Sequence, residues 1–450
     1  MSWLRAPWME QRRWLLGLAL LDTVLLTSTY NYLFWLRFGR YAGITGSIST
    51  LALIWLGLSY LLGRYSKDHR SGNGKSILWI TSITTTIVMV LAWLGIAKDP
   101  RSLPDFMLPL LGSTATLSAI AQWFLNQKAS QTRNWILILT DKEKLLLEES
   151  MKEKEKNRHC LNRIVYVDAT EALKTFARSK KSYEIAISSK VKLTDEEIEE
   201  LLKLRSKGSR VLDIVSWHEL TFQSVSPGLL SSRWLLLAEG FQLRPNSVGW
   251  RVKRLVDIVL SSTLLITCSP IIAAAAFLIM LEDGRPVFYS QRRTGLYGEA
   301  FQIWKLRSMR KDAEAGGIQW SKANDRRITK IGYWLRRLRF DEMPQLINVL
   351  IGDMSLIGPR PERPEIEIML EDQIPHYRIR HWIRPGISGW AQVSCPYGAS
   401  ISDSREKLSY DIYYMRNYSI SLDILILLKT VRLIAMAKGS EPRRELDQND

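Results

Sequence analysis

The stretch Arg251–Leu281, which reads RVKRLVDIVLSSTLLITCSPIIAAAAFLIML, decides the architecture of this chain. Its basic start leads into the apolar run Ile258–Leu281, and a membrane-spanning helix needs about 20 such residues. Ser269 and Pro270 lie in the middle of that run, where a proline removes one helical hydrogen bond and kinks the helix. The residues alone leave two alternatives. One is a full span with a kink, and the other is a re-entrant helix, about residues 255–281, that enters and leaves at one membrane face.

Four further apolar runs fill the first quarter of the chain: Trp14–Leu36, Ile48–Leu62, Ile77–Ile96 and Phe106–Phe124. They are almost free of charge all round, which predicts a four-helix transmembrane bundle over residues 1–130 rather than a buried globular core. With the N-terminus inside, the inner segments carry nine basic residues and the outer loops carry four. Basic loops favour the cytosolic side, so we expect both ends of the bundle there. No run ends in a small-residue cleavage site, so we expect no removable signal peptide.

Residues 134–216 read as an α/β domain, because short apolar segments of strand character alternate with charged helical segments. This alternation predicts a small parallel sheet of Rossmann-like type. The expected strands are Trp135–Thr140, Arg163–Val167, Tyr183–Ser188 and Arg210–Val215, and the expected helices are Asp141–Asn157, Ala169–Ser179 and Thr194–Lys207. The turn Leu139–Glu143 has no glycine, whereas a nucleotide-binding version needs a glycine-rich turn there. We therefore interpret the domain as structural or regulatory.

The remaining composition narrows the class of protein. Residues 217–250 contain several glycines and two prolines and are expected to form an irregular connector, while the charged tail 439–450 is expected to be disordered. The formal net charge of +17 suits anionic lipid or phosphorylated substrates. Nucleic acid is disfavoured, because the basic residues lie among membrane segments and not on one soluble motif. The three cysteines are widely spaced, which fits neither a disulfide framework nor a metal site.

Residues 285–423 gather side chains that suit phosphate, and the acidic pair Asp341-Glu342 lies among them. Adjacent carboxylates repel each other, so such a pair needs a cation or arginines nearby. Pro344 suits the first turn of a following helix, which would put the pair near a helix N-terminus. Carboxylates, a divalent metal and arginines together serve phosphoryl transfer. A solvated acidic pair that caps a helix fits the same residues.

From Lys253 to about Val431 the chain resembles the catalytic domain of the bacterial sugar transferases, the monotopic phosphoglycosyl transferases. The matching motifs, in order, are Lys253-Arg-x-x-Asp257, Ser269-Pro270, Lys305-x-Arg307-Ser-Met, Asp341-Glu342-x-Pro-Gln-Leu, Gly352-Asp-Met-Ser-Leu-x-Gly-Pro-Arg360-Pro and Arg384-Pro-Gly-x-Ser-Gly-Trp. The bundle and the α/β domain resemble, by architecture alone, the large polyprenyl-phosphate hexose-1-phosphate transferases. One departure is Arg339-Phe340, where the family often has a small residue or Thr before the acidic pair.

The resemblance implies a reaction and roles for particular residues. Asp341 would attack the sugar-bearing phosphorus of a UDP-hexose, expel UMP, and pass the sugar phosphate to undecaprenyl (polyprenyl) phosphate. Glu342 would hold Mg²⁺ against the diphosphate, and Arg360 would bind phosphate. Weaker candidates for binding the donor or lipid phosphate are Lys305, Arg307, Arg327 and Arg384.

The resemblance also implies a location. Ser269-Pro270 would be the break in a re-entrant helix. Re-entry keeps a C-terminal α/β catalytic domain, residues 251–438, at the cytoplasmic face of the bacterial inner membrane, in contact with membrane lipid. The product would initiate exopolysaccharide, capsule or O-antigen synthesis. Glucose and galactose are the expected sugars by family habit only. The sequence does not fix the oligomeric state, and a homodimer is one arrangement it allows.

Two other functions are alternatives to the transferase. A membrane-anchored nucleotide-sugar dehydratase or epimerase would need a glycine-rich dinucleotide loop and a Tyr-x-x-x-Lys pair, and the sequence has neither. A non-catalytic membrane sensor or assembly protein would have no need of the intact Asp341, Glu342 and Arg360. A turnover assay separates this last alternative from the transferase.

Overall fold

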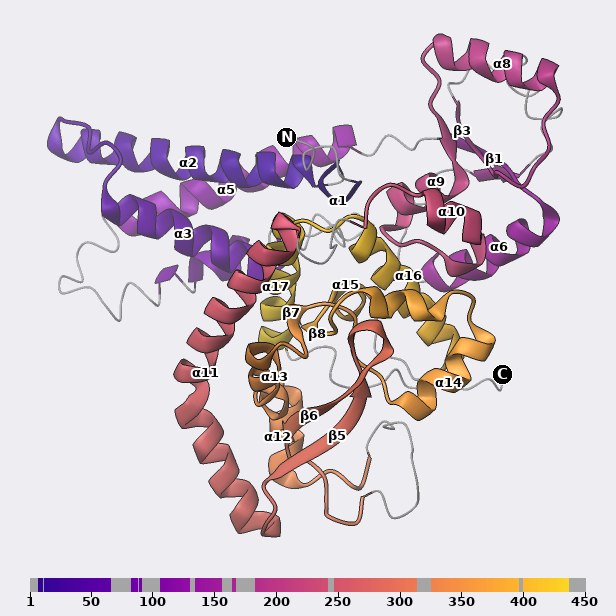
Figure 1. Ribbon diagram of the computed structural model, residues 1–450. Coiled ribbons are helices and arrows are strands. Elements are labelled where there is room, and N and C mark those ends of the chain that lie inside the picture. Colours follow the sequence, from indigo (N-terminus) through magenta and orange to yellow (C-terminus); the bar gives the residue numbers. More distant parts are fainter. Residues whose placement is uncertain are drawn as a thin grey trace, which may run out of the picture. The chain divides into compact units, whose positions relative to one another are not determined.

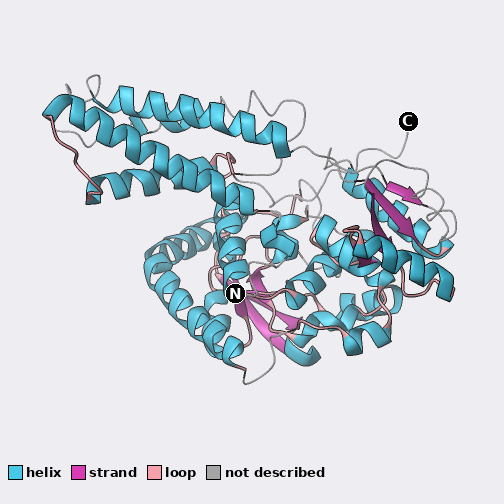
Figure 2. Cartoon of the chain, turned by 90° about the horizontal axis from the view of Figure 1, so that it is seen from above, coloured by secondary structure: helices cyan, strands magenta, loops and turns pink. Residues whose placement is uncertain are grey.

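The computed structural model describes residues 7–10, 12–65, 82–87, 89–90, 106–129, 134–155, 164–166, 183–241, 247–313, 325–395 and 400–436. Helices predominate over strands in the cartoon of Figure 2, and the fold mixes helix with sheet (Figures 1 and 2). The chain divides into two compact units, one over Pro7–Ile214 and the other from Val215 onward.

The first unit opens with the short helix α1 (Pro7–Glu10) and three long helices that lie side by side in Figure 1. These are α2 (Arg13–Phe38), α3 (Gly46–Leu61) and α5 (Leu108–Ala129). Gly39 ends α2 in the left-handed conformation at φ 66°, which glycine adopts without a steric cost. The Thr45 side chain then caps the start of α3.

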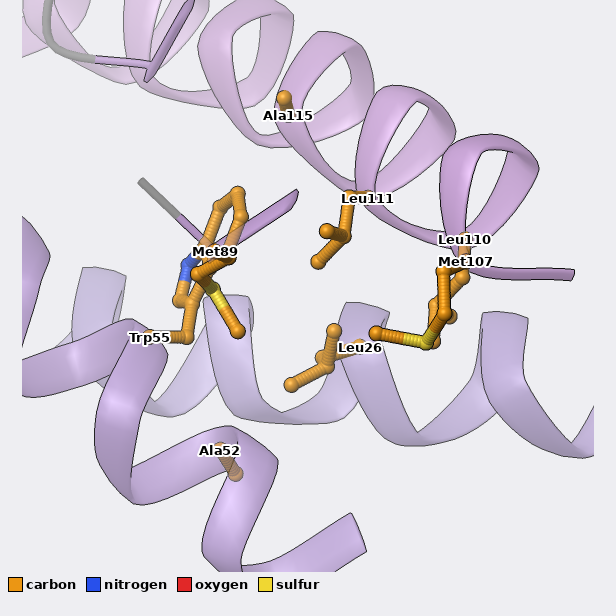
Figure 3. Close-up of a cluster of buried hydrophobic side chains, with 8 residues drawn as sticks. All are labelled: Leu26, Ala52, Trp55, Met89, Met107, Leu110, Leu111 and Ala115. Atoms are coloured by element: carbon orange, nitrogen blue, oxygen red, sulfur yellow. The ribbon is translucent and has the colours of Figure 1, made fainter. Parts of the chain in front are cut away.

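The core between these helices is apolar (Figure 3). It consists of Leu26, Ala52, Trp55, Met89, Met107, Leu110, Leu111 and Ala115. Met89 belongs to the third predicted apolar run, of which residues 82–87 and 89–90 are helical and the rest lies outside the described residues. A polar cluster also joins three segments, since Asp22 forms an ion pair with Arg64 at 3.6 Å and accepts a hydrogen bond from Ser118.

One helix of the described residues, α11 (Val248–Asp283) in the second unit, is both long and apolar enough to cross a membrane. α3 is a shorter apolar helix of 16 residues. The chain therefore has the mixed α and β fold and the apolar helix that suit a membrane-associated protein. The bundle of four membrane spans stays a prediction.

The α/β part of the first unit contains the predicted parallel sheet. Its elements are β1 (Asn134–Ile138), α6 (Asp141–Glu155), β2 (Ile164–Tyr166), β3 (Tyr183–Ile187), α8 (Asp195–Ser206) and β4 (Val211–Asp213). The strand order is β2-β1-β3-β4, and every neighbouring pair is parallel. Thr194 and Glu197 form a capping box at the start of α8, which confirms the predicted helix start. The expected helix Ala169–Ser179 lies outside the described residues.

The turn after β1 has no glycine, and the buried carboxylate of Glu143 lies beside it. Glu143, in the first turn of α6, accepts hydrogen bonds from the Thr140 hydroxyl at 2.9 Å and the Ser188 hydroxyl at 2.8 Å. Burial alone would raise the pKa of Glu143, but these hydrogen bonds and Lys190 outweigh it and lower the pKa. A helix N-terminus at this edge of a parallel sheet is where nucleotide folds bind phosphate. The protein's own carboxylate lies at that position. A structural or regulatory role of the domain stays a prediction.

The expectation of an irregular connector at residues 217–250 is wrong for the described part of that segment. It contains most of α9 (Ile214–Phe222), the turn η4 (Pro227–Leu229) and α10 (Ser232–Leu237). Trp217 and His218 are fully buried, and Trp390 donates its indole N–H to Gln223 O at 2.9 Å. The segment folds because its apolar side chains pack into the second unit, and Pro227 begins a helical turn there.

α11 (Val248–Asp283) is the longest helix of the second unit and bows along one side of it in Figure 1. Only about a tenth of its most apolar window is buried, 11%. The helix continues through Ser269 and Pro270 as one element, so the expected break does not interrupt it. Re-entry into the membrane stays a prediction.

The basic entrance of α11 ties the helix to the rest of the unit. Lys253 pairs with Asp423 at 2.9 Å, and Asp257 accepts a hydrogen bond from the backbone N–H of Leu356 at 3.1 Å. Arg254 donates to two carbonyls at the end of a neighbouring helix. The Lys-Arg-x-x-Asp motif is therefore a structural anchor.

The rest of the second unit surrounds a hairpin and a two-stranded parallel sheet. Its elements are β5 (Phe288–Thr294), η5 (Leu296–Gly298), β6 (Ala300–Leu306), α12 (Lys330–Arg337), η6 (Phe340–Glu342), α13 (Gln345–Ile351), β7 (Ser355–Ile357), α14 (Pro364–Gln373), η7 (Tyr377–Trp382), β8 (Gly386–Ser388), α15 (Trp390–Ser394), α16 (Ile401–Arg416) and α17 (Ile420–Ala435). β5 and β6 are antiparallel, and β7 and β8 are parallel.

Three glycines let two backbone segments touch beside β7 and β8. A Cβ on Gly386 would lie 2.1 Å from the backbone N of Gly358, and a Cβ on Gly358 would lie 2.4 Å from Arg384 O. A Cβ on Gly389 would lie 2.2 Å from Gly358 O. The glycines of the Gly-Pro-Arg-Pro and Arg-Pro-Gly motifs are thus required for close backbone approach.

Candidate active site

Asp341 and Glu342 lie on the short turn η6, between α12 and α13. Pro344 follows as the N-cap of α13, so the pair stands at a helix N-terminus, as the sequence predicts. Arg339 begins the turn in the left-handed conformation at φ 59°, which is costly for a residue other than glycine. Both carboxylates are buried, with Asp341 8% and Glu342 5% exposed.

Three cations surround Glu342. Its Oε1 accepts from Lys305 Nζ at 3.3 Å and from Arg360 Nη2 at 2.5 Å, and its Oε2 accepts from Arg339 Nη1 at 3.3 Å. Burial opposes ionisation, but Arg360, Lys305 and Arg339 outweigh it, so the pKa of Glu342 lies well below its ordinary range. Glu342 is therefore a fixed anion at neutral pH.

Asp341 differs from its neighbour. Within the described residues, no hydrogen bond or ion pair engages its carboxylate. Burial and the charge of Glu342 raise the pKa of Asp341, while Lys305, Arg336 and Arg339 act in the opposite direction. The two adjacent carboxylates thus have unequal environments: three cations bind one, and the other makes no hydrogen bond or ion pair within the described residues.

Two of the cations predicted from the sequence belong to this cluster. Lys305 lies on β6, and burial lowers its pKa although Glu342 raises it. Arg360 follows β7, and its side chain is 32% exposed beside Glu342. Together with the acidic pair, these residues form a partly open site with several cations.

The other three candidate cations are engaged elsewhere. Arg307 donates to the backbone carbonyls of Asp283 at 3.0 Å and Gly284 at 2.7 Å, at the end of α11. Arg327 makes a bidentate ion pair with Asp325. Arg384 lies over the ring of Trp250, 4.6 Å from its centroid. These contacts are structural, and a role of the three residues in phosphate binding stays a prediction.

Three further arginines of the site were missed from the sequence. Arg339 contacts Glu342, Arg336 acts on Asp341, and Arg293 lies close enough to Arg360 and Lys305 for their charges to interact. The available signals were the Arg339-Phe340 departure from the family pattern and the Gln-Arg-Arg-Thr-Gly stretch at residues 291–295. Neither signal says which arginine points to the acidic pair.

Comparison with known proteins identifies the family. The model of the bacterial sugar transferase family matches residues 248–437. The chain is 44% identical over 198 residues to the UDP-N-acetylgalactosamine-undecaprenyl-phosphate N-acetylgalactosaminephosphotransferase of Aeromonas hydrophila, which covers 44% of this chain and 47% of that protein. It is 37% identical over 188 residues to the UDP-glucose:undecaprenyl-phosphate glucose-1-phosphate transferase of Escherichia coli (strain K12), which covers 41% of this chain and 40% of that protein.

The match spans less than half the length of these two relatives. A shorter relative, the exopolysaccharide production protein PSS of Rhizobium leguminosarum bv. phaseoli, is 38% identical over 186 residues, which is 40% of this chain and 93% of that protein. Since the match covers almost all of this relative at 38% identity, the chain belongs to the bacterial sugar transferase family.

Proposed function

We propose that the protein transfers a sugar 1-phosphate from a UDP-sugar to undecaprenyl phosphate and releases UMP. The observation that carries the proposal is the unequal acidic pair: Asp341 makes no hydrogen bond or ion pair within the described residues, whereas Glu342 has three cations. The names of the relatives, which act on UDP-sugars and undecaprenyl phosphate, agree with it. The product would begin the assembly of a bacterial polysaccharide.

Asp341 suits the part of nucleophile. Its ionised carboxylate oxygen would bond to the sugar-bearing phosphorus, the bond from that phosphorus to the UMP oxygen would break, and UMP would leave with the electron pair. An oxygen of undecaprenyl phosphate would then attack the same phosphorus and free the Asp341 carboxylate. Lys305, Arg336 and Arg339 favour the ionised form of Asp341 that the first step needs.

The charge balance of the site suits a diphosphate. Four cations (Lys305, Arg336, Arg339 and Arg360) act on two carboxylates, which leaves an excess of two positive charges. A nucleotide-sugar diphosphate carries about two negative charges and could be held by such an excess in a partly buried site. Arg360 is the best placed to share its planar fork with a phosphate, because its side chain is partly exposed.

Mg²⁺ is part of the proposal. The described residues contain no group of three or more His, Cys, Asp or Glu that could hold a metal alone. Mg²⁺ is commonly held by one or two carboxylates together with substrate phosphates, which fits the two adjacent carboxylates. Within the described residues, Asp341 makes no hydrogen bond or ion pair, and Glu342 Oε2 has one cationic partner. When bound, the metal would neutralise charge on the diphosphate.

We also propose a setting in the membrane. The exposed apolar surface of α11 supports contact with lipid. In this proposal α11 is re-entrant, the apolar runs of residues 1–130 form four spans, the parallel sheet is a Rossmann-like structural domain, and the acidic pair faces the cytoplasm at the inner membrane. The UDP-sugar then meets the enzyme on the side where it is made.

Release of UMP tests the proposal. Purified full-length protein in detergent with Mg²⁺ is given UDP-glucose, UDP-galactose or UDP-N-acetylgalactosamine, with and without undecaprenyl phosphate. Turnover that depends on the lipid and yields UMP supports the function and names the sugar. Release of UDP would indicate a glycosyl transferase instead, and no release from any donor would favour a non-catalytic protein.

A further inference from the structure

The segment Gly358–Glu362 carries Arg360, whose guanidinium meets Glu342 at the proposed active site. Four successive carbonyl groups of this segment accept hydrogen bonds from other elements. The pairs are Gly386 N to Pro359 O at 2.8 Å, Arg380 Nη2 to Arg360 O at 2.8 Å, Arg293 Nη1 to Pro361 O at 3.3 Å, and Thr294 N to Glu362 O at 3.0 Å. Two backbone amides and two guanidinium groups therefore hold the segment in place.

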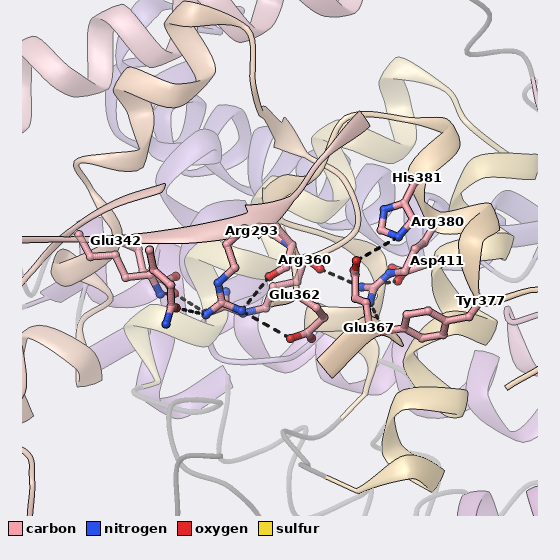
Figure 4. A network of polar contacts seen from close by, with 12 residues as sticks. Arg293, Glu342, Arg360, Glu362, Glu367, Tyr377, Arg380, His381 and Asp411 are labelled. Atoms are coloured by element: carbon pink, nitrogen blue, oxygen red, sulfur yellow. Dashed lines mark hydrogen bonds and ion pairs between the residues drawn. The ribbon is translucent and has the colours of Figure 1, made fainter. Parts of the chain in front are cut away.

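Arg380 is the more deeply buried of the two guanidinium donors, with a side chain 5% exposed against 16% for Arg293. Its Nη2 also meets Asp411 Oδ2 at 3.3 Å, and its guanidinium lies 5.0 Å from the ring centroid of Tyr377 (Figure 4). One planar group thus joins the Arg360 backbone to α16. A lysine ammonium has the same charge but lacks the fixed fork.

We propose that Arg380, held by Asp411, is a positioning residue that fixes the backbone at Arg360 and so directs the Arg360 side chain to Glu342. This role rests on the proposed function. Among the described residues, no hydrogen bond or ion pair joins Arg380 to Asp341 or Glu342, so an effect on the chemistry must pass through Arg360. Misplacement of a catalytic group by about 1 Å can cost roughly a hundredfold in rate.

A double-mutant cycle separates positioning from general damage. Arg380→Lys should lower kcat/KM for UMP release about tenfold, and should change it less than about twofold when Arg360 is already Ala. Arg416→Lys is the matched control. Arg416 is a half-buried arginine of the same unit that pairs with Glu219 at 2.8 Å and lies over Trp234. Among the described residues it makes no hydrogen bond or ion pair with the 358–362 segment. It should show no coupling to Arg360→Ala.

Hydrogen exchange gives a second measurement that needs no activity. The amides of Gly386 and Thr294 donate to Pro359 O and Glu362 O, so loosening of the segment exposes them. Arg380→Lys should speed exchange in peptides that contain these two amides by about tenfold or more, whereas Arg416→Lys should leave them unchanged.

The outcomes separate the two proposals. An equal loss of kcat/KM in both Arg360 backgrounds would overturn the positioning role, and so would unchanged exchange at Gly386 and Thr294. If wild-type protein releases no UMP, or Arg360→Ala has no measurable activity, exchange alone decides. If wild-type protein releases no UMP, the proposed transfer is wrong, but hydrogen exchange still tests whether Arg380 fixes residues 358–362.

Discussion

Replacing Glu342 by Gln removes one negative charge and little volume, so it measures what the charge of this residue contributes to the free energy of unfolding. Wild-type Glu342 is 5% exposed and meets Lys305, Arg339 and Arg360. Removing one partner of a buried ion pair typically costs about 3–5 kcal/mol, because the remaining charge is left uncompensated. Gln keeps one acceptor oxygen for the cations, so we expect a loss near the lower end, about 3 kcal/mol.

The pH dependence of the loss follows from the pKa of Glu342. That pKa lies well below the unfolded value, so the stabilising contribution is present above the unfolded pKa and is lost as pH falls through the folded one. The difference between wild type and Glu342→Gln should therefore be complete at pH 7 and shrink in acid. Urea unfolding of the detergent-solubilised protein at pH 7 and pH 4 measures this difference.

The same substitution should affect turnover. Without the charge of Glu342, the pKa of Asp341 should fall, since Glu342 is one of the two causes that raise it. The acid limb of the pH profile for UMP release should move to lower pH, while the maximal rate falls about 10²–10³-fold through the disturbed cations and metal. Unchanged stability at pH 7, or an acid limb that moves to higher pH, would refute this account of the site.

Three more predictions test separate parts of the structure. Asp341→Asn should abolish UMP release, because the amide cannot act as the nucleophile, and a variant that keeps near-normal activity would exclude the covalent scheme. The same change should stabilise the fold by about 1 kcal/mol, because a neutral group replaces a buried carboxylate whose pKa is raised. Burial raises the pKa of Glu367 to about 7, so the folded protein holds an extra proton between about pH 4.5 and 7 and loses stability as pH rises through that window. Glu367→Gln should remove this slope and be up to about 3 kcal/mol more stable than wild type at pH 8, with no gain at pH 4, as measured by urea unfolding. Arg339→Gly and Arg339→Ala remove the same charge, so both should slow UMP release about tenfold. The Gly variant should be about 1 kcal/mol more stable to unfolding than the Ala variant, because residue 339 has φ 59°. Equal stability of the two variants would mean that the turn relaxes.

The sequence predicted those features that depend on local pattern. Pro344 and the apolar residues after it put Asp341 and Glu342 at the start of a helix, and the alternation of strand and helix gave the parallel sheet with Thr194 at a helix start. Both follow from short-range rules of helix capping and hydrophobic periodicity.

Features that depend on distant contacts were not accessible in the same way. Nothing local to Arg307 indicates that it caps the end of α11, and nothing local to Arg339 indicates that it folds back on Glu342. The helices of residues 217–241 were missed because glycine and proline there suggested an irregular chain, whereas burial of Trp217 and Phe222 stabilises helix. Which arginine serves the site is a property of tertiary packing.

The contact of Gly358, Gly386 and Gly389 has a consequence for protein engineering. Two motifs that lie far apart in the sequence meet backbone to backbone, and neither tolerates a Cβ at the contact. Chimaeras made with relatives of different donor preference should therefore inherit residues 358–362 and 384–389 from the same parent. A crossover point between the two motifs would combine one motif from each parent, and the backbone contact between them leaves no space for a change in either.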